Sequence, residues 1–454
     1  MTSIVLFTRD LRVHDHAGLS AAARESEHVV PLFVLDDTLV GPGASPNRLA
    51  FLLDALGDLR ESLRERGGDL IVRCGDPVEE TIRVTRAAGA DTVFVGADAS
   101  LYAQRRTERL ERECARGRIE LRIENTVAAV PPGELAPAGR DHYRVFTPYW
   151  RRWYHAELPP VARAPRRLRL PAGIAVGRLP ALGKLTERRP SPSLPQGGER
   201  EARRRLERWL ARGLRGYGDA RDELAADGTS ELSPYLHFGC SSANEVVTRA
   251  RGQGRVAEAF VRQLWRDFYL QLLAANPRLP SEDLNPRGDD WSNDDDAPAR
   301  WREAQTGYPI VDAAMRQLRA EGWMHNRARL IVASFLTKTL YVDWRLGAAV
   351  FFDLLVDGDV ANNVGNWQWV AGTGVDTRPN RVFNPIGQAG RFDPDGAYVR
   401  RHVPELAELD GASVHEPWRA KRDRVASQYP EPIVDHSEAN ARFRARRRRH
   451  AARA

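Results

Sequence analysis

The 454 residues exceed what one hydrophobic core usually supports, so the length predicts two domains. The chain has 68 Lys and Arg against 61 Asp and Glu, but the final 13 residues, RFRARRRRHAARA, hold seven Arg and no acid. The rest of the chain is therefore formally neutral, and it can bind DNA only if its basic groups gather on one face. The Arg-rich end, residues 431–454, is interpreted as a disordered, solvated tail.

The cysteines and the N-terminus argue against a secreted, zinc-binding or membrane protein. Cys74, Cys114 and Cys240 lie far apart without CxxC or Cys/His spacing, so we expect no disulfide framework and no metal site. The apolar run in MTSIVLFTRD is too short for a signal peptide or a membrane span. We expect a soluble, cytoplasmic protein.

Short apolar segments alternate with helix-like segments in the first part of the chain. Strand patterns cover 3–7, 29–35, 70–73, 92–95 and 120–123, and helical patterns cover 48–66, 77–88 and 103–115. Such alternation predicts βαβ units and a mainly parallel, doubly wound sheet, which binds ligands at the carboxyl ends of its strands. No GxGxxG follows the first strand, so a dinucleotide fingerprint is absent there.

A stretch crowded with Pro, Gly and Arg separates this part from a helical one. Residues 159–198 show no sustained period, whereas helical patterning resumes at Glu199 and continues to about Tyr429. The predicted organisation is an α/β domain (1–130), a connector (131–198), an all-helical domain (199–430) and the basic tail (431–454).

The helical part holds two patterns that suggest a ligand site. Two core helices, near 310–318 and 328–340, adjoin a polar cluster interleaved with Trp, and buried polar groups cost free energy unless they are partnered. Upstream, the hydroxyls of Thr229, Ser230 and Ser233 stand at the start of a helix in GTSELSPYLHFG, as either a capping motif or an anion site. The polar cluster includes His325, Asn326, Arg327, Arg329, Asp357, Asp359, Asn362, Asn363 and Asn366.

Several motifs in this order, FTRDLRVHDH, WMHNRAR, DGDVANN, NWQWVAGTGVD and RFDPDGAYVRRHVPEL, resemble the DNA photolyase and cryptochrome family. The likeness is greatest to its microbial class I cyclobutane pyrimidine dimer photolyases. It implies an antenna-chromophore domain followed by a helical FAD-binding domain. It also implies that Asn363 faces the reactive flavin nitrogen and that Arg329 pairs with Asp357, which could equally be a structural salt bridge. The FAD-binding residues implied are Tyr217, Thr229, Ser230, Glu231, Leu232, Ser233, Asn326, Arg329, Asp357, Asp359 and Asn363.

The same resemblance assigns electron-transfer and substrate residues. Trp367, Trp344 and Trp291 correspond, in order outward, to the family's electron relay, although each Trp could instead serve packing. The substrate set is Gln263, Trp265, Leu330 and Trp369 around a flipped-out dimer, with Arg327 and Arg381 at the DNA backbone.

Two positions depart from the family's pattern at this pocket. Gln263 stands one residue closer to Trp265 than usual, and in a helix this turns its side chain by about 100°, so it would not reach the dimer unless the helix bulges. Leu330 replaces a usual Met of similar volume.

The predicted function is deoxyribodipyrimidine photolyase activity, in which light-excited reduced FAD donates an electron to a pyrimidine dimer in DNA and the dimer splits. Alternatives are a cryptochrome photoreceptor, a (6-4) photoproduct enzyme, which would have His in place of Asn326 and Leu330, and a nucleotide-binding α/β protein with a helical DNA-binding module. We expect a monomer that binds damaged DNA without sequence preference. The resemblance implies an antenna chromophore, and Arg48 and Asp98 correspond to residues of family members that use a deazaflavin, so 8-hydroxy-5-deazaflavin is favoured over methenyltetrahydrofolate or no antenna.

Overall fold

The computed structural model describes residues 1–454 except 42, 227, 265, 293–295, 420–428 and 452–454. The chain forms two compact units. The α/β unit comprises Met1–Pro190, Pro195–Arg215 and Ser230–Pro277, and the helical unit comprises Ser191–Leu194, Gly216–Thr229 and Arg278–Ala454. None of the helices in the described ranges combines the length and hydropathy that a membrane span needs.

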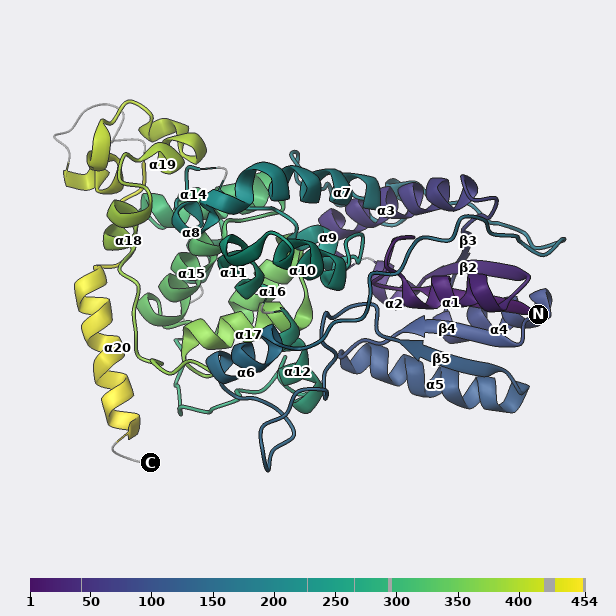
Figure 1. Ribbon diagram of the computed structural model, residues 1–454. Coiled ribbons are helices and arrows are strands. Elements are labelled where there is room, and N and C mark those ends of the chain that lie inside the picture. Colours follow the sequence, from purple (N-terminus) through teal and green to yellow (C-terminus); the bar gives the residue numbers. More distant parts are fainter. Residues whose placement is uncertain (42, 227, 265, 293–295, 420–428, 452–454) are drawn as a thin grey trace. The chain divides into compact units, whose positions relative to one another are not determined.

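The α/β unit is built on one sheet in which every strand pairing is parallel (Figure 1). The strand order β3-β2-β1-β4-β5 puts β1 at the centre, with β2 and β4 on either side of it. The strands agree with the predicted ones to within one or two residues, because buried parallel strands are recognisable as short apolar runs. They are β1 (Thr2–Phe7), β2 (His28–Leu35), β3 (Ile71–Cys74), β4 (Thr92–Gly96) and β5 (Glu120–Glu124).

Helices cover both faces of this sheet, as a doubly wound fold requires. On one face, Ile4 and Leu6 of β1 share a core with Ile82 of α4 (Pro77–Ala88). In β4, Phe94 lies between two residues whose side chains belong to that core, so its own side chain points to the other face of the sheet. On that face, α1 (Ala17–Glu25) packs closely against Phe94 at Gly18. The helix α4 has the predicted bounds, since Asp76 caps its start and Gly89 ends it in a left-handed conformation.

The remaining helices of the α/β unit range from single turns to α3, which has 19 residues. One prediction about them is wrong, because Gln263 does not lie within a continuous helix: α11 ends at Arg262 and α12 begins at Arg266. The argument that a missing residue rotates Gln263 by one helical step therefore does not apply. These helices are α2 (Asp37–Val40), α3 (Pro46–Arg64), α5 (Leu101–Gly117), α6 (Phe146–Tyr154), η1 (Leu182–Lys184), α7 (Glu199–Arg208), η2 (Trp209–Gly213), α9 (Ser233–His237), α10 (Ala243–Arg251), η4 (Gly254–Ala257), α11 (Glu258–Arg262) and α12 (Arg266–Ala275), and η3 (Leu214–Gly216) adjoins the boundary.

The helical unit contains the two predicted core helices, α14 (Pro309–Glu321) and α15 (Asn326–Ser334), the second continued by the π-helical turn η5 (Phe335–Thr339). The other elements are α8 (Tyr217–Ala220), α13 (Asp296–Arg302), α16 (Trp344–Leu354), α17 (Val360–Ala371), α18 (Pro385–Phe392), α19 (Ala397–His402), η6 (Pro404–Leu406), η7 (Gly411–His415), η8 (Pro417–Arg419) and α20 (His436–Ala451).

The Arg-rich end is not the disordered tail that its composition predicts, because its described part forms the helix α20. Ala439, Phe443 and Arg447 stand four residues apart, and all three are buried. This spacing places them on one face of the helix, which packs against η5. Because the other Arg residues of α20 dominate its composition, the composition alone does not reveal this narrow buried face.

Candidate active site

A cavity of about 90 Å³ opens among α15, α16 and α17 in the helical unit. Its size is well below the several hundred Å³ of a site that encloses a whole ligand, so it can take only part of one. The wall includes four of the predicted flavin residues, the predicted substrate residue Leu330 and the first predicted relay residue, Trp367. Its lining consists of Asn326, Arg329, Leu330, Ala333, Phe351, Leu355, Asp357, Gly358, Asn362, Asn363, Asn366, Trp367 and Val370.

Side-chain caps fix where the helices that carry these residues begin. His325 Nδ1 accepts the backbone N–H of Arg327 at 3.1 Å and so begins α15, with Asn326 as its first residue. Asp359 Oδ1 accepts the N–H of Asn362 at 2.9 Å and begins α17. Asp359 is thus a helix cap at the edge of the site, since it does not belong to the cavity wall.

Arg329 and Asp357 form the predicted ion pair. The Nη2 of Arg329 lies 2.9 Å from Oδ2 of Asp357, and its Nε donates to the carbonyl of Met324 at 2.8 Å. The carboxylate is 3% exposed and the guanidinium 24%. A buried carboxylate of this kind holds a cation at the wall of the cavity.

Two buried polar atoms of the wall have no hydrogen-bond partner among the described residues, Asp357 Oδ1 and Trp367 Nε1. Leaving such atoms unpaired costs on the order of 1–3 kcal/mol each, so the site suits a ligand that carries both donors and acceptors. The polar edge of a flavin ring has that pattern, and the asparagines of the same wall add amide groups. The residues present therefore fit the edge of a flavin, which would extend beyond this small cavity.

Asn363 is held in place from the neighbouring helix. It is 9% exposed and its Nδ2 donates to the carbonyl of Ala348 in α16 at 2.8 Å. Asn366 Nδ2 donates to the carbonyl of Asn362 at 2.8 Å, within α17. The site's amides are therefore oriented by the protein itself.

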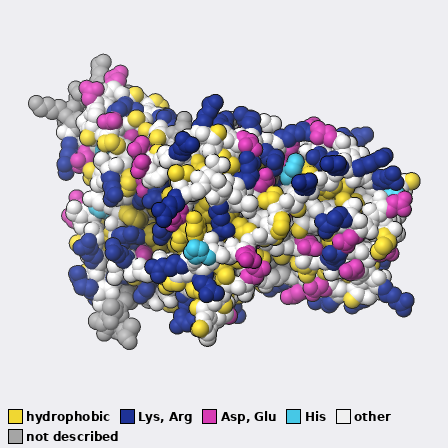
Figure 2. All heavy atoms as spheres, in the orientation of Figure 1, with side chains coloured by type: hydrophobic (Ala, Val, Ile, Leu, Met, Phe, Trp, Pro, Cys, Tyr) yellow, Lys and Arg dark blue, Asp and Glu magenta, His cyan; other side chains and the backbone are white. Residues whose placement is uncertain are grey.

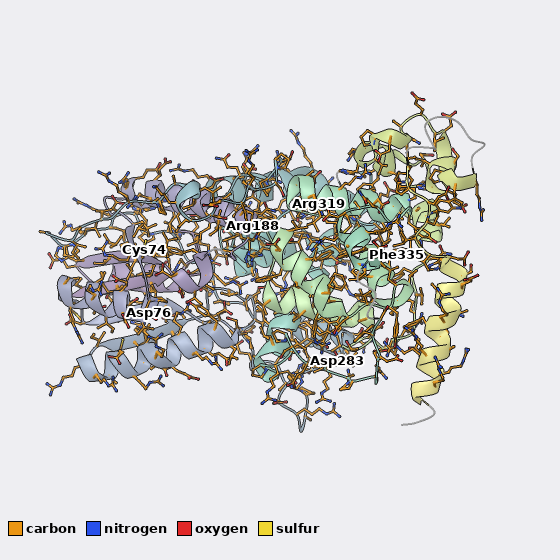
Figure 3. All side chains as sticks on the ribbon, turned by 180° about the vertical axis from the view of Figure 1, so that it is seen from behind. Cys74, Asp76, Arg188, Asp283, Arg319 and Phe335 are labelled. Atoms are coloured by element: carbon orange, nitrogen blue, oxygen red, sulfur yellow. The ribbon has the colours of Figure 1, made fainter. Side chains whose placement is uncertain are left out.

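Trp367 packs closely against α16 at a glycine, Gly347, where no side chain keeps the ring away. Its ring contacts Gly347, and Trp344 lies three residues earlier on the same helix, which puts it on the same side of α16. The indole N–H of Trp344 donates to Asp283 Oδ1 at 2.8 Å; Figure 3 labels Asp283. Both indoles are buried, at 2% and 0% exposure.

Trp291, the third predicted relay residue, is half-buried and packs on Tyr341, with ring centroids 5.1 Å apart. The following residue, Ser292, donates its N–H to the carbonyl of Tyr341 at 2.8 Å. Tyr341 precedes Trp344 by three residues, so this contact anchors Trp291 near the start of α16.

The other predicted FAD-binding residues lie in a different stretch. Tyr217 is buried at the start of α8, where burial raises the pKa of its hydroxyl to about 12. Thr229 belongs with it to the helical unit. In the α/β unit, Leu232 donates its N–H to Ser230 Oγ at 3.4 Å, and Ser233 begins α9. Glu231 has a positive φ of 49° and pairs with Arg205.

The predicted substrate residues are not all brought together. Arg381 lies over the ring of Trp369, with its guanidinium carbon 4.9 Å from the ring centroid. Arg327 instead pairs with Asp222 at 2.8 Å and stacks on Phe392 at 4.2 Å. Trp265 lies outside the described residues, and Gln263 is half-buried after α11.

The predicted antenna residues lie in the α/β unit. Asp98 follows β4 and pairs with Arg9, which follows β1, at 3.0 Å. Burial alone would raise the pKa of Asp10 beside them, but His16, 3.3 Å away, and the N–H of Thr8 lower it to about 2. This ion pair stands at the switch point between β1 and β4, where such sheets bind ligands. Arg48 lies at the start of α3, where Ser45 caps its N–H.

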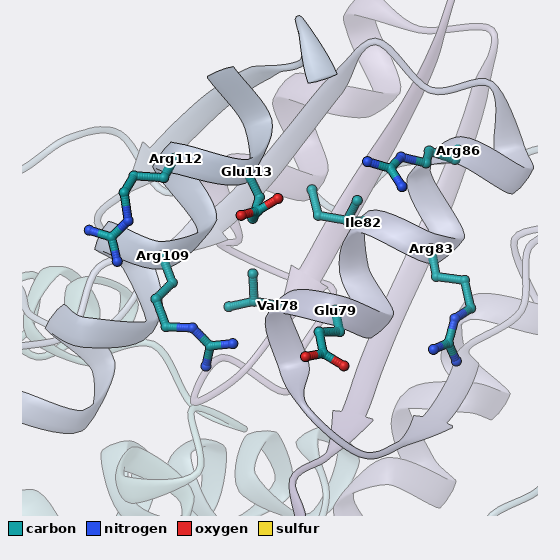
Figure 4. Close-up of a pocket in the computed structure, with 8 residues that line it drawn as sticks. All are labelled: Val78, Glu79, Ile82, Arg83, Arg86, Arg109, Arg112 and Glu113. Carbon is teal, nitrogen blue, oxygen red and sulfur yellow. The ribbon is translucent and has the colours of Figure 1, made fainter. Parts of the chain in front are cut away.

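A second hollow, of about 600 Å³, lies between α4 and α5 (Figure 4). Val78 and Ile82 form its apolar part. The residues at its rim are Glu79, Arg83, Arg86, Arg109, Arg112 and Glu113. Arg109 is paired with Asp76 and Arg83 with Glu80, and two glutamates stand among the remaining arginines, so much of the positive charge is balanced.

Figure 2 shows Lys and Arg side chains over both the helical and the α/β parts of the face in view, with Asp and Glu side chains interspersed among them. The segregation of charges expected of a neutral protein that binds DNA is therefore not seen on this face.

Sequence reasoning missed the residues that hold the site residues in place. Asp222, Ala348 and Asp283 act as partners of Arg327, Asn363 and Trp344 from distant parts of the chain. Gly347 could have been noticed, since a glycine inside a helical pattern often marks close packing.

Models of known families match two parts of the chain. Residues 3–166 match the model described as DNA photolyase, and residues 260–449 match the FAD binding domain of DNA photolyase. A deoxyribodipyrimidine photo-lyase of Streptomyces griseus is 52% identical over 447 residues, which cover 97% of this chain and 98% of the relative.

Solved structures resemble the whole chain. A class III photolyase from Agrobacterium tumefaciens has a TM-score of 0.93 at 34% identity and covers 99% of this chain and 98% of its own. A Synechocystis cryptochrome has a TM-score of 0.90 at 29% identity, with 98% of each chain covered.

Proposed function

The chain belongs to the DNA photolyase family and acts as a deoxyribodipyrimidine photo-lyase, and we propose that the cavity among α15, α16 and α17 is its catalytic centre. FAD is the cofactor, as the match to the family's FAD-binding domain indicates. The observation that carries the proposal is the buried Arg329–Asp357 pair beside Asn363 in a cavity whose wall has unpaired polar atoms.

When bound, reduced FAD excited by light supplies the electron that splits a cyclobutane pyrimidine dimer. Arg329 holds a positive charge at the wall, which favours an anionic ring. Asp357 keeps that guanidinium in place. Asn363, anchored on Ala348, would supply an amide to the ring, and the resemblance implies that it acts at the reactive nitrogen. The other residues that the family resemblance assigns to FAD are Tyr217, Thr229, Asn326 and Asp359 in the helical unit and Ser230, Glu231, Leu232 and Ser233 in the α/β unit.

Trp367, Trp344 and Trp291 carry electrons to an oxidised cofactor. The support is their arrangement along α16: Trp367 packs on Gly347, Trp344 lies one helical turn before it, and Trp291 is anchored at Tyr341, just before the helix. Indoles are suited to this role because they can be oxidised and can pass the electron hole on over short gaps.

In the helical unit, Trp369 and Leu330 are proposed to contact the dimer and Arg381 the DNA backbone; the resemblance also assigns Gln263 and Trp265 to the substrate, of which Trp265 lies outside the described residues. A phosphate contact reads no sequence, so the enzyme acts on damaged DNA wherever the dimer lies. Arg327 contributes more by its pair with Asp222 than by contact with phosphate. We further propose that the enzyme is a monomer and that it works in the cytoplasm, where its three free cysteines stay reduced.

An antenna chromophore binds in the α/β unit at the switch point marked by Arg9 and Asp98. Arg48 provides a second cation at the start of α3. We favour 8-hydroxy-5-deazaflavin over methenyltetrahydrofolate there, because the match of Arg48 and Asp98 is to members that use a deazaflavin. The cryptochrome alternative is not favoured, since the Streptomyces griseus relative at 52% identity is a photo-lyase.

The test is repair of an oligonucleotide with a single dimer by the purified, chemically reduced protein under blue light. Loss of the dimer in light but not in darkness is the expected result. Bound flavin without repair would contradict the proposed activity. A strong absorption band in the near-visible beyond that of the flavin supports the deazaflavin antenna, and its absence after saturation with that compound would contradict it. Asn363→Ala is expected to alter the flavin's redox behaviour and to slow repair.

A further inference from the structure

Lys338 is a buried lysine that the catalytic site does not use. It lies in the π-helical turn η5 and is 2% exposed. Its ammonium donates to two backbone carbonyls, those of Pro379 at 2.9 Å and Arg381 at 2.6 Å. Burying an ammonium group costs free energy unless it is hydrogen-bonded, and π-helical turns are frequent at functional sites. The two hydrogen bonds of Lys338 therefore suggest a role beyond packing.

The two carbonyls belong to a segment between α17 and α18 that has no regular secondary structure of its own. Gly372 turns the chain at the end of α17 with φ of +84°, and a Cβ there would lie 2.4 Å from the carbonyl oxygen of Pro379. Further along, Phe383 donates its N–H to Ser334 Oγ at 3.1 Å. Lys338 therefore fastens the middle of a segment that is held at both ends.

This segment carries Arg381, the predicted DNA contact. The guanidinium carbon lies 4.9 Å from the ring centroid of Trp369 and 5.1 Å from that of Phe383. Its side chain is 38% exposed, and Asp376 lies 4.0 Å away at the limit of an ion pair. The cation thus stays accessible, and its direction depends on the backbone that Lys338 holds.

We propose that Lys338 is a positioning residue for DNA binding: by holding the carbonyls of Pro379 and Arg381, its ammonium fixes the guanidinium of Arg381 over Trp369, where it meets a phosphate. This inference rests on the proposed function, in which Arg381 contacts the DNA backbone.

The surroundings make this clamp sensitive to pH. Burial lowers the pKa of Lys338 to about 7, with Asp376 and Asp289 favouring the charged form and Arg447 and Arg381 opposing it. From α20, the ring of Phe443 lies 5.8 Å from Nζ, and His436 contacts the adjacent Thr339 at 3.4 Å. The described part of the Arg-rich end thus covers the lysine.

Protonation of Lys338 is expected to strengthen DNA binding. Above about pH 7 the neutral amine makes weaker bonds to the two carbonyls than the ammonium does. A phosphate that approaches Arg381 brings negative charge near Lys338 and favours its charged form. Affinity for DNA therefore falls as pH rises through neutrality, and binding takes up a proton.

The test compares the full-length holoenzyme with Lys338→Met, Lys338→Arg and Arg381→Ala, with the exposed Lys184→Met as control. Binding of a duplex with one dimer is measured by titration from about pH 6 to about pH 8.5, and proton uptake by calorimetry in buffers of different ionisation enthalpy. Wild type and Lys184→Met are expected to lose several-fold in affinity across this range. Lys338→Met should bind weakly and without pH dependence, and Lys338→Arg, if it fits, should stay strong at high pH.

The outcomes separate this inference from the proposed function. If Arg381→Ala weakens binding while Lys338→Met keeps the wild-type pH curve and proton uptake, the role of Lys338 is overturned. If Arg381→Ala binds as wild type does, the proposed DNA contact fails first. Should Lys338→Met not fold, a wild-type pH profile in Lys338→Arg overturns the inference on its own.

Discussion

A methyl group at Gly347 would lie 2.2 Å from the outer edge of the Trp367 ring. Atoms of a folded protein do not approach so closely, so α16 and the indole can pack together only because residue 347 has no side chain. The ring of Trp367 also lines the catalytic cavity, and its neighbours Phe351 and Trp301 hold it edge-on at 4.9 and 6.1 Å. The position of Trp367, the first residue of the proposed relay, is therefore set by a glycine on another helix.

Gly347→Ala is expected to push Trp367 toward the cavity and to weaken both folding and flavin retention. Overpacking of this kind costs about 1–3 kcal/mol in the free energy of unfolding. Urea unfolding and the flavin-to-protein absorbance ratio measure the two effects. The matched control is Gly390→Ala, since nothing lies near the methyl that it adds and alanine favours its helix α18. Equal stability of the two variants would contradict the packing argument.

Asp357→Asn is expected to lower the free energy of unfolding by about 1–3 kcal/mol, because it leaves Arg329 without its buried countercharge. The loss stays below that of a fully buried pair since the guanidinium is 24% exposed. The variant should also retain less FAD, which dialysis followed by absorption measures. Glu438→Gln breaks an exposed pair with Arg442 and should change neither quantity.

Trp367→Phe should slow photoreduction of the oxidised cofactor while sparing repair by enzyme that is already reduced. Phenylalanine fills most of the space but is much harder to oxidise than an indole. Light-driven reduction is followed by absorption, and repair is measured separately after chemical reduction. Trp301→Phe is the control, since this indole packs on Trp367 and donates to the Val332 carbonyl at 3.1 Å but has no place in the relay. Loss of flavin binding in Trp367→Phe alone would indicate a packing role instead.

Stability should fall as the pH falls from about 6.5 to about 4, partly because of His325. Burial, together with Arg329 and Arg327, lowers the pKa of this cap to about 4. Between these pH values the unfolded chain binds a proton that the folded protein does not, which costs up to about 3 kcal/mol. His325→Asn keeps a capping oxygen but does not titrate, so its denaturation midpoint should change less with pH. The exposed His155→Asn should follow the wild type; three parallel curves would contradict the assignment.

The α/β fold could be predicted because local patterns determine its strands and helices, whereas the residues of the candidate site followed from the resemblance of their motifs to a known family. Val, Ile and Leu runs located the five strands, and the Asp76 cap with Gly89 bounded α4. The pairing of Arg329 with Asp357 was also predicted and is present, although its role toward the flavin stays a prediction.

Other features depend on contacts that no local pattern records. The acceptor of Asn363 lies 15 residues earlier in α16, and that of Lys338 lies 41 residues later, beyond α17. The break between α11 and α12 replaced an expected continuous helix. The end of the chain was mistaken for a solvated tail because two of the four buried residues in the described part of α20, His436 and Arg447, are polar or charged.

The chain passes from one compact unit to the other at residues 190, 194, 215, 229 and 277. Neither unit is therefore a continuous piece of the gene, and no single cut yields an intact fragment of either one. A recombination event with one crossover cannot replace the α/β unit by that of a relative without also dividing the helical unit. The two parts are consequently expected to be inherited together, and chimeric enzymes need to exchange the segments 191–194 and 216–229 along with residues 278–454.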